Sequence, residues 1–167
     1  MRRIIEIAGV IICFVLQCTF FQAVSFAGIV PNLLIIITSC AGFIGGKRDG
    51  MITGFMAGLL TDIFYGNVIG INALIFLYIG YINGFGNRVF YPEDLKFPMV
   101  FIALSDISCL FLQYFFGFLF RARLELPFYF AHIMIPEIIY TMVVTIIIYM
   151  PVRGLVNRIY DRRREIQ

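Results

Sequence analysis

Long apolar stretches, separated by few charged residues, dominate this chain. Ile7 to Gly46 contains no charged residue, and Gly50 to Asn87 contains only Asp62. A helix that crosses the ~30 Å hydrocarbon core of a bilayer needs about 20 residues, so each of these stretches accommodates two helices, and two later stretches accommodate one each. The pattern predicts a single polytopic domain, 1–167, with six transmembrane helices at about 5–27, 31–46, 50–65, 68–87, 97–120 and 127–152.

These stretches are expected to be helical. Inside lipid every backbone N–H and C=O must be paired within the protein, so only α-helices and closed β-barrels span a membrane. A barrel strand alternates apolar and polar residues over about 10 positions, whereas 33–37 reads Leu-Leu-Ile-Ile-Ile. The chain is therefore predicted to be an all-α integral membrane protein. Its first stretch exceeds the about 7–15 apolar residues of a cleaved signal peptide, so we expect it to be retained as an anchor.

Basic residues predict the orientation of the helices. Cytoplasmic segments of membrane proteins carry an excess of lysine and arginine. With the N-terminus in the cytoplasm, only Arg121 and Arg123 of the 13 lysine and arginine residues are external. Both termini are therefore expected in the cytoplasm, and the basic tail 153–167 is expected to contact anionic lipid headgroups.

Composition narrows the class of protein. Hydrophobic residues make up 61% of the chain and charged residues 14%, with a mean hydropathy of +0.94, whereas soluble domains are roughly half apolar and about a quarter charged. His132 is the only histidine, the cysteines lack Cys-x-x-Cys spacing, and no nucleotide-binding loop or nucleophile elbow is present. We therefore expect no metal, no cofactor, no nucleic-acid partner and no catalytic activity.

Glycines recur at four-residue spacing in the third predicted helix. Gly50, Gly54 and Gly58 lie along one helix face, and Gly70 follows beyond the next turn. Small residues four apart let another helix backbone approach closely, which is the GxxxG packing device of membrane helices. These four glycines are predicted to form a helix-packing motif within the protein.

Asp62 continues the same spacing and places a carboxylate within a predicted span. A charge there costs about 2.5–3.5 kcal/mol on insertion scales, so Asp62 is not expected to face lipid. Either it caps the turn from Gly66 to Asn72 with hydrogen bonds, or it contacts a ligand or partner. As a structural cap it should tolerate Asp62→Asn almost silently, because the amide keeps one acceptor oxygen.

Other polar residues are predicted near the outer ends of the helices. Asn72, Gln113, His132 and Glu137 fall in the outer halves of their predicted helices, as Asp62 does. Together they could line a polar cavity open to the outside, or they could form interhelical hydrogen bonds of about 0.6 kcal/mol each. Asp62, Asn72, His132 and Glu137 are the candidate buried polar, partner or ligand contacts.

Asp106 is a further carboxylate within an apolar stretch. It falls in the inner half of its predicted helix, so we expect it to be separate from the residues near the outer ends. Ser105, Ser108 or a tyrosine is expected to supply its hydrogen bonds.

Residues 31–85 resemble the MreD family of rod shape-determining membrane proteins. The similar segments are Pro31-Asn32-Leu33-Leu34, Gly54-Phe55, Gly58-Leu59-Leu60-Thr61-Asp62, and Gly66 with Gly70. In the family a proline opens the second helix, and a glycine-spaced helix ends in Gly-Leu-Leu-x-Asp before a short turn and another glycine. The size, the six predicted spans and the short basic tail agree with this resemblance.

The resemblance implies a function. It implies a non-catalytic membrane component of the bacterial cell-wall elongation complex, which maintains rod shape from a multi-pass location in the cytoplasmic membrane. The implied partners are the bitopic protein MreC, a RodA-like glycosyltransferase, a penicillin-binding transpeptidase and the actin-like MreB filament, besides the membrane lipids.

Two other functions stay open. The MreD family is thought to resemble the six-helix S components of energy-coupling-factor transporters, so the chain could be a substrate-binding subunit of a small-molecule transporter. Such a subunit is expected to carry an Ala-x-x-x-Ala coupling patch on its first helices, and the first predicted helix lacks one. An intramembrane lipid-processing enzyme is the third class. Asp62 and Glu137 would be its acid/base pair, although nothing in the sequence places them at a defined distance.

The positive-inside distribution generates a topological prediction. Reporters fused at Lys47, Glu93 or Gln167 should be cytoplasmic, and reporters at Gly28, Asn67 or Glu125 should be external. Paired alkaline phosphatase and fluorescent protein fusions measure this directly. An external C-terminus would contradict the six-span arrangement.

Overall fold

The computed structural model describes residues 2–23, 30–66, 68–88, 96–121, 132 and 134–147. All the regular secondary structure in these ranges is helical, which confirms the predicted all-α class. The elements are α1 (Arg2–Cys18), α2 (Phe20–Ala23), α3 (Leu33–Gly45), α4 (Lys47–Tyr65), α5 (Ile71–Phe85), the short 3-10 helix η1 (Gly86–Arg88), α6 (Lys96–Arg121) and a further helix, Ile135–Ile147.

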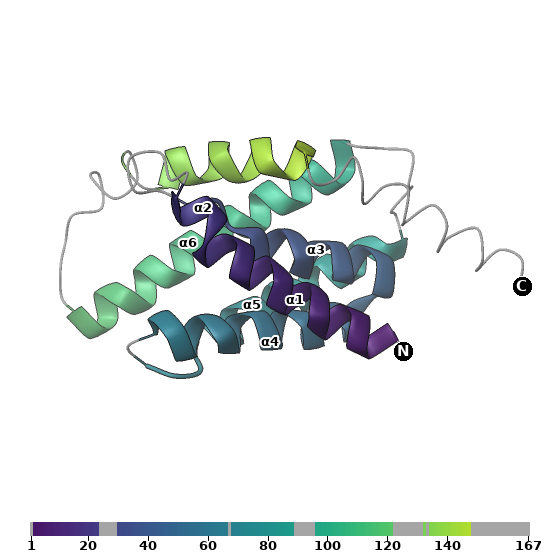
Figure 1. Cartoon of the computed structure of the whole chain (residues 1–167), viewed down its shortest axis with the longest axis horizontal. Helices are drawn as coiled ribbons and strands as arrows, with labels where there is room; N and C mark the ends of the chain where they lie inside the picture. The colour runs from purple at the N-terminus through teal and green to yellow at the C-terminus, as the bar shows by residue number, and fades with distance from the viewer. Residues whose placement is uncertain are drawn as a thin grey trace, which may run out of the picture.

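Consecutive long helices run in opposite directions through the bundle (Figure 1). α1 begins at the right-hand end of the view, where α3 also turns into α4 and α6 begins. α4 turns into α5 at the left-hand end. The helix Ile135–Ile147, lime green at the top of the view, runs from left to right. The described helices therefore form an up-and-down bundle with two distinct ends.

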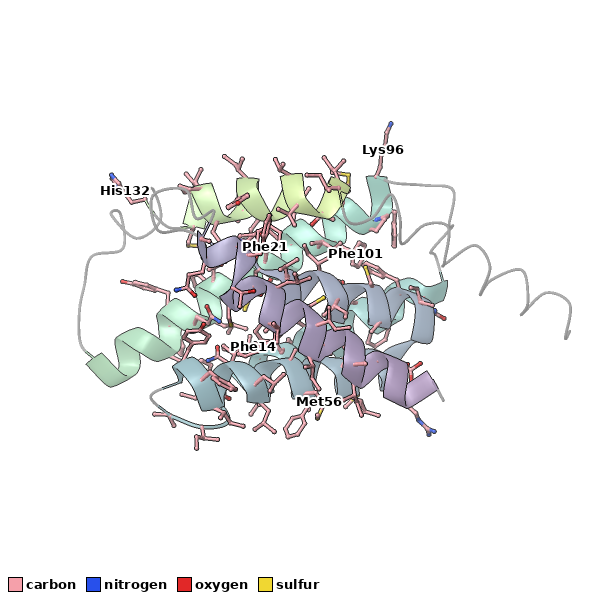
Figure 2. The ribbon with its side chains drawn as sticks, viewed as in Figure 1. Phe14, Phe21, Met56, Lys96, Phe101 and His132 are labelled. Carbon is pink, nitrogen blue, oxygen red and sulfur yellow. The ribbon has the colours of Figure 1, made fainter. Side chains whose placement is uncertain are left out.

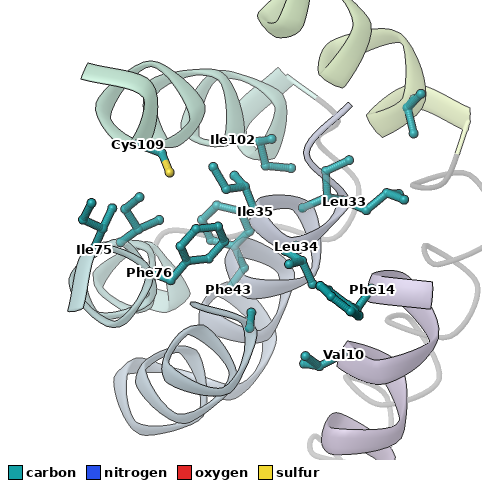
Figure 3. Close-up of a cluster of buried hydrophobic side chains, with 14 residues drawn as sticks. Val10, Phe14, Leu33, Leu34, Ile35, Phe43, Ile75, Phe76, Ile102 and Cys109 are labelled. Carbon is teal, nitrogen blue, oxygen red and sulfur yellow. The ribbon is translucent and has the colours of Figure 1, made fainter. Parts of the chain in front are cut away.

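α3 lies at the centre of this bundle. Its sequence is apolar on nearly every side and it packs against α1, α4, α5 and α6, as expected of a helix that is buried all round. In Figure 3, Leu34 faces Phe14 of α1, while Ile35 lies beside Phe76 of α5 and near Ile102 of α6. α3 thus forms the common packing surface that positions the other helices.

The outer surface of the bundle is apolar. Among the described residues, Glu6–Ala23 and Lys96–Phe116 are long and apolar enough to cross a membrane, and Leu33–Gly45, Ile71–Phe85 and Ile135–Ile147 are shorter apolar helices. Large aliphatic side chains point outward all along the helix at the top of Figure 2. So much contiguous exposed apolar surface suits lipid and would be a liability in water.

The helix bounds differ in places from the predicted spans. The span predicted at 5–27 is interrupted between α1 and α2, and residues 24–29 lie outside the described ranges. The span predicted at 68–87 becomes helical only at Ile71, because Gly70 before it adopts a left-handed conformation with φ 108°. The tail 153–167 and both ends of the span predicted at 127–152 lie outside the described residues.

Candidate functional site

The glycines of α4 lie directly against the backbone of α5. A Cβ atom added to Gly50, Gly54 or Gly58 would come within 3.0 Å of a backbone carbonyl oxygen of α5, respectively that of Gly80, Phe76 and Asn72. Real Cβ atoms essentially never approach a carbonyl so closely. At these three positions glycine is therefore required by the contact between the helices.

The contact is reciprocal, which the sequence analysis missed. A Cβ on Gly80 would collide with the backbone of Gly50, and one on Gly84 would collide with the backbone of Lys47. Gly84 also approaches Gly42 of α3. The signal was present in the sequence, because Gly80-Tyr-Ile-Asn-Gly84 has the same four-residue spacing.

Gly70 differs from the other glycines of the predicted motif. A Cβ at this position would meet nothing within 4 Å, so Gly70 makes no close packing contact. Its φ of 108° lies in the left-handed region, which residues other than glycine adopt only with strain. Gly70 is therefore needed for the left-handed backbone conformation at the start of α5, and not for helix packing.

The Asp62 carboxylate caps the beginning of α5 from the end of α4. Its Oδ2 accepts hydrogen bonds from the backbone N–H of Gly70 (2.8 Å) and of Ala73 (3.0 Å), and its Oδ1 accepts one from the N–H of Asn72 (3.1 Å). Gly70 is the N-cap residue and has no side chain to do this. The first N–H groups of a helix lack partners within the helix and carry partial positive charge, so a carboxylate satisfies both needs.

The capping network extends from Asp62 to a third helix. The Asn72 amide donates to Asp62 Oδ1 (2.9 Å) and its Oδ1 accepts from Gln113 Nε2 of α6 (2.9 Å). Asp62 is 1% exposed, and both of its oxygens accept two hydrogen bonds each. This arrangement favours a structural cap over a ligand contact, because neither oxygen is left open.

The expectation that Asp62→Asn would be silent in a structural cap does not fit this geometry. All four groups that surround the carboxylate are N–H donors. An asparagine keeps one acceptor oxygen and turns an NH₂ group toward the remaining donors, which leaves them unpaired. The sequence shows how many acceptor oxygens an asparagine keeps at position 62, but it does not show how many donors converge on that position.

His132 and Glu137 are not joined to this network. His132 is exposed and lies at the left-hand edge of the molecule, pointing away from the bundle (Figure 2). Glu137 is half-buried on the helix Ile135–Ile147, where it interacts electrostatically with Asp106. The structure therefore divides the predicted outer cluster, with Asp62, Asn72 and Gln113 together and the other two elsewhere.

Asp106 is fully buried on α6 and is not bonded as predicted. Ser105 instead accepts a hydrogen bond from Asn83 (2.7 Å), and Ser108 donates to the carbonyl of Leu104 (2.7 Å). Thr141 of the helix Ile135–Ile147 lies beside the Asp106 carboxylate, but neither carboxylate oxygen has a hydrogen-bond partner of good geometry among the described residues. Asp106 thus belongs with the contact between that helix and α6, and the expectation that it stands apart from Glu137 is corrected.

Asn83 forms a second buried network that the sequence analysis did not identify. Its Nδ2 shares its two protons among three acceptors, the Ser39 hydroxyl of α3 (3.2 Å), the Ser105 hydroxyl of α6 (2.7 Å) and the carbonyl of Ile79 (3.0 Å). One buried amide therefore ties α3, α5 and α6 together. The only signal in the sequence is an amide residue in an apolar stretch.

These features together define a class of protein. The described helices present apolar outer surfaces, pack through glycine contacts and are tied together by interhelical hydrogen bonds, which is the construction of an all-α membrane protein. The chain belongs to the MreD family, matching rod shape-determining protein MreD over residues 1–159. The family consists of non-catalytic membrane proteins that determine rod cell shape. No curated protein and no solved structure matches the chain.

The glycine contact predicts that Gly54→Leu destabilises the protein severely. A leucine must separate α4 from α5 at the Phe76 carbonyl, so we expect a loss of at least about 3 kcal/mol, the upper end for overpacking. The yield of folded protein and the melting temperature in detergent measure the effect. Phe55→Leu, at the neighbouring outward-facing position, is the matched control, and equal yields for the two variants would contradict the packing argument.

The capping geometry predicts that Asp62→Asn destabilises the start of α5. Losing hydrogen bonds to a charged acceptor costs about 1.5–3 kcal/mol each, so a clear fall in melting temperature is expected. Hydrogen exchange should accelerate at the N–H groups of Gly70 and Ala73 in particular. Ile63→Ala, which changes an exposed neighbour, serves as the control. Unchanged exchange at the start of α5 would refute the capping role.

Proposed function

We propose that this protein is a non-catalytic membrane component of the bacterial cell-wall elongation complex and acts by binding an MreC-like bitopic protein. The observation that carries the proposal is the family match over residues 1–159. Through this partner, or directly, the protein joins a RodA-like glycosyltransferase, a penicillin-binding transpeptidase and the MreB filament. Membership of the family supports a role in determining rod shape and, with it, a place in the cell-wall elongation complex.

We further propose that the chain crosses the cytoplasmic membrane six times with both termini inside. Support comes from the bias of lysine and arginine toward the proposed cytoplasmic segments. The alternating helix directions are compatible with it, since α1 begins and the helix Ile135–Ile147 ends at the same end of the bundle (Figure 1). In this orientation the Asp62 cap lies near the outer surface of the membrane.

A protein of this construction must recruit its partners through helix faces and short loops. Little of its mass lies outside the apolar helices. In lipid the hydrophobic effect does not drive one helix onto another, so van der Waals packing and interhelical hydrogen bonds supply the association energy. The glycines of α4 and the Asp62 carboxylate are already used within the bundle, so partner binding falls to other surfaces.

Nothing at Asp62 favours the transporter alternative. A substrate site in the predicted outer cluster would need polar groups that face an open cavity. The Asp62 oxygens are instead occupied by four donors of the protein itself. Glu137 and His132, the other candidates for such a cavity, are not joined to Asp62.

Depletion of the protein in its source bacterium is expected to round or swell the cells. The reason is that the complex that synthesises the lateral cell wall loses one of its membrane components. Cell width measured by microscopy reports the effect, and an affinity-tagged copy should copurify with the MreC-like protein. Complementation with Phe55→Leu should restore width, whereas Gly54→Leu should not. Normal width after depletion, together with a vitamin-sized ligand retained on purification, would favour the transporter subunit instead.

A further inference from the structure

α5 carries an outward-facing stripe of large side chains, three of them aromatic. Leu74, Tyr78, Tyr81 and Phe85 are 65%, 54%, 36% and 50% exposed. They follow one another at steps of four, three and four residues, which is the spacing of a heptad seam between left-handed helix pairs. The opposite side of α5 is the side that packs on the glycines of α4. We call these four residues the α5 stripe.

The α5 stripe holds two hydroxyl groups to which the described residues offer no hydrogen-bond partner. Exposed hydroxyls elsewhere on the described helices all have partners: Thr19 donates to the Val15 carbonyl (2.6 Å), Ser108 to the Leu104 carbonyl (2.7 Å) and Tyr65 to the Cys18 sulfur (3.1 Å). Within the part of the chain that the structure describes, the hydroxyls of Tyr78 and Tyr81 have no hydrogen-bond partner. The two unpaired hydroxyls thus coincide with one stripe.

An unpaired hydroxyl at the depth of Tyr78 is unfavourable in lipid. It is the eighth residue of the 15-residue helix α5, so its Cα lies about 10 Å from either helix end. Moving a hydroxyl from water to an apolar medium without a hydrogen bond carries a penalty of several kcal/mol. Acyl chains offer no acceptor at this depth. By contrast, the outward residues Ile135, Ile139 and Val143 of the last described helix are aliphatic and suit lipid.

The inner end of the α5 stripe is positively charged. The Lys47 ammonium lies over the ring of Phe85, 3.3 Å from its centroid, and 5.5 Å from that of Tyr81. The stripe therefore presents hydrogen-bond donors along its length and a cation at one end. Its electrostatic complement is a surface that brings acceptor oxygens to the tyrosines and no cation to Lys47.

We propose that the α5 stripe is the docking surface for a single transmembrane helix of the bitopic partner, and that this helix places a hydrogen-bond acceptor at the depth of Tyr78. The proposal rests on the proposed function and names the surface through which it acts. A second copy of the chain is the less favourable occupant. A two-fold axis along the membrane normal would set equivalent residues opposite one another, and would bring Lys47 toward Lys47.

Site-specific photocrosslinking tests the docking surface. A photoreactive phenylalanine analogue replaces Tyr78 in the full chain, co-expressed with the tagged bitopic protein of the same bacterium. The matched controls carry it at Phe111 of α6 or at Ile139, which are 57% and 59% exposed on other faces. We expect a crosslink to the transmembrane helix of the bitopic protein from position 78 and none from the two controls.

The hydroxyl itself is tested by Tyr78→Phe. Because this hydroxyl has no partner within the described residues, the melting temperature of the isolated protein should not change. Recovery of the bitopic protein should weaken about threefold, which corresponds to an average interhelical hydrogen bond in a membrane. Phe111→Leu should leave recovery unchanged.

Several outcomes would overturn the proposal. Crosslinks from Phe111 or Ile139 alone would place the partner on another face, while the complex and the proposed function stand. Crosslinks from position 78 to a second copy, or to lipid alone while the bitopic protein copurifies, would likewise exclude this occupant. If the unmodified protein fails to copurify with the bitopic protein and depletion leaves cell width normal, the proposed function itself fails.

Discussion

The structure depends on a constraint that burial imposes on helix ends: N–H groups at the start of a helix need partners, and water does not reach them where the helix start is buried, as it is beside the 1% exposed Asp62. α5 begins with a glycine, so it cannot cap itself with a side chain. Asp62 supplies the missing acceptor from the neighbouring helix and takes three backbone N–H groups at once. A carboxylate that would be costly in isolation becomes the counterpart of the positive end of α5.

This cap can form only if α4 and α5 meet at a fixed register and a short distance. The glycines provide both conditions. Each step of four residues along α4, from Gly50 to Gly54 to Gly58, is matched by a step of four in the reverse direction along α5, from Gly80 to Phe76 to Asn72. The next step along α4 is Asp62 itself. The same periodicity that sets the helices in contact therefore delivers the carboxylate to the helix start.

The sequence allowed the all-α class and the glycine face of α4 to be predicted. The class follows from the apolar composition of the long stretches, and the face follows from the four-residue spacing of the glycines. The sequence also placed Asp62 in line with the glycines, since it continues their spacing, but it left open whether this carboxylate caps a turn or contacts a ligand or partner. The donors that converge on it could not be predicted, because the conformation of Gly70 decides which N–H groups point inward. Nor could the pairing of Asp106 with the helix Ile135–Ile147 be foreseen, because hydropathy does not say which helices are neighbours.

The same limit applies to the outward faces. Most positions of α5 are apolar or aromatic, so the sequence alone cannot separate the side that packs on α4 from the side that faces outward. The three-dimensional arrangement makes that separation, and it shows that the polar atoms of Tyr78 and Tyr81 fall on the outward side. Family resemblance draws attention to Gly58-Leu59-Leu60-Thr61-Asp62, but these residues act inside the bundle. They fix the rotation and depth of α5, and thereby the surface that α5 turns outward.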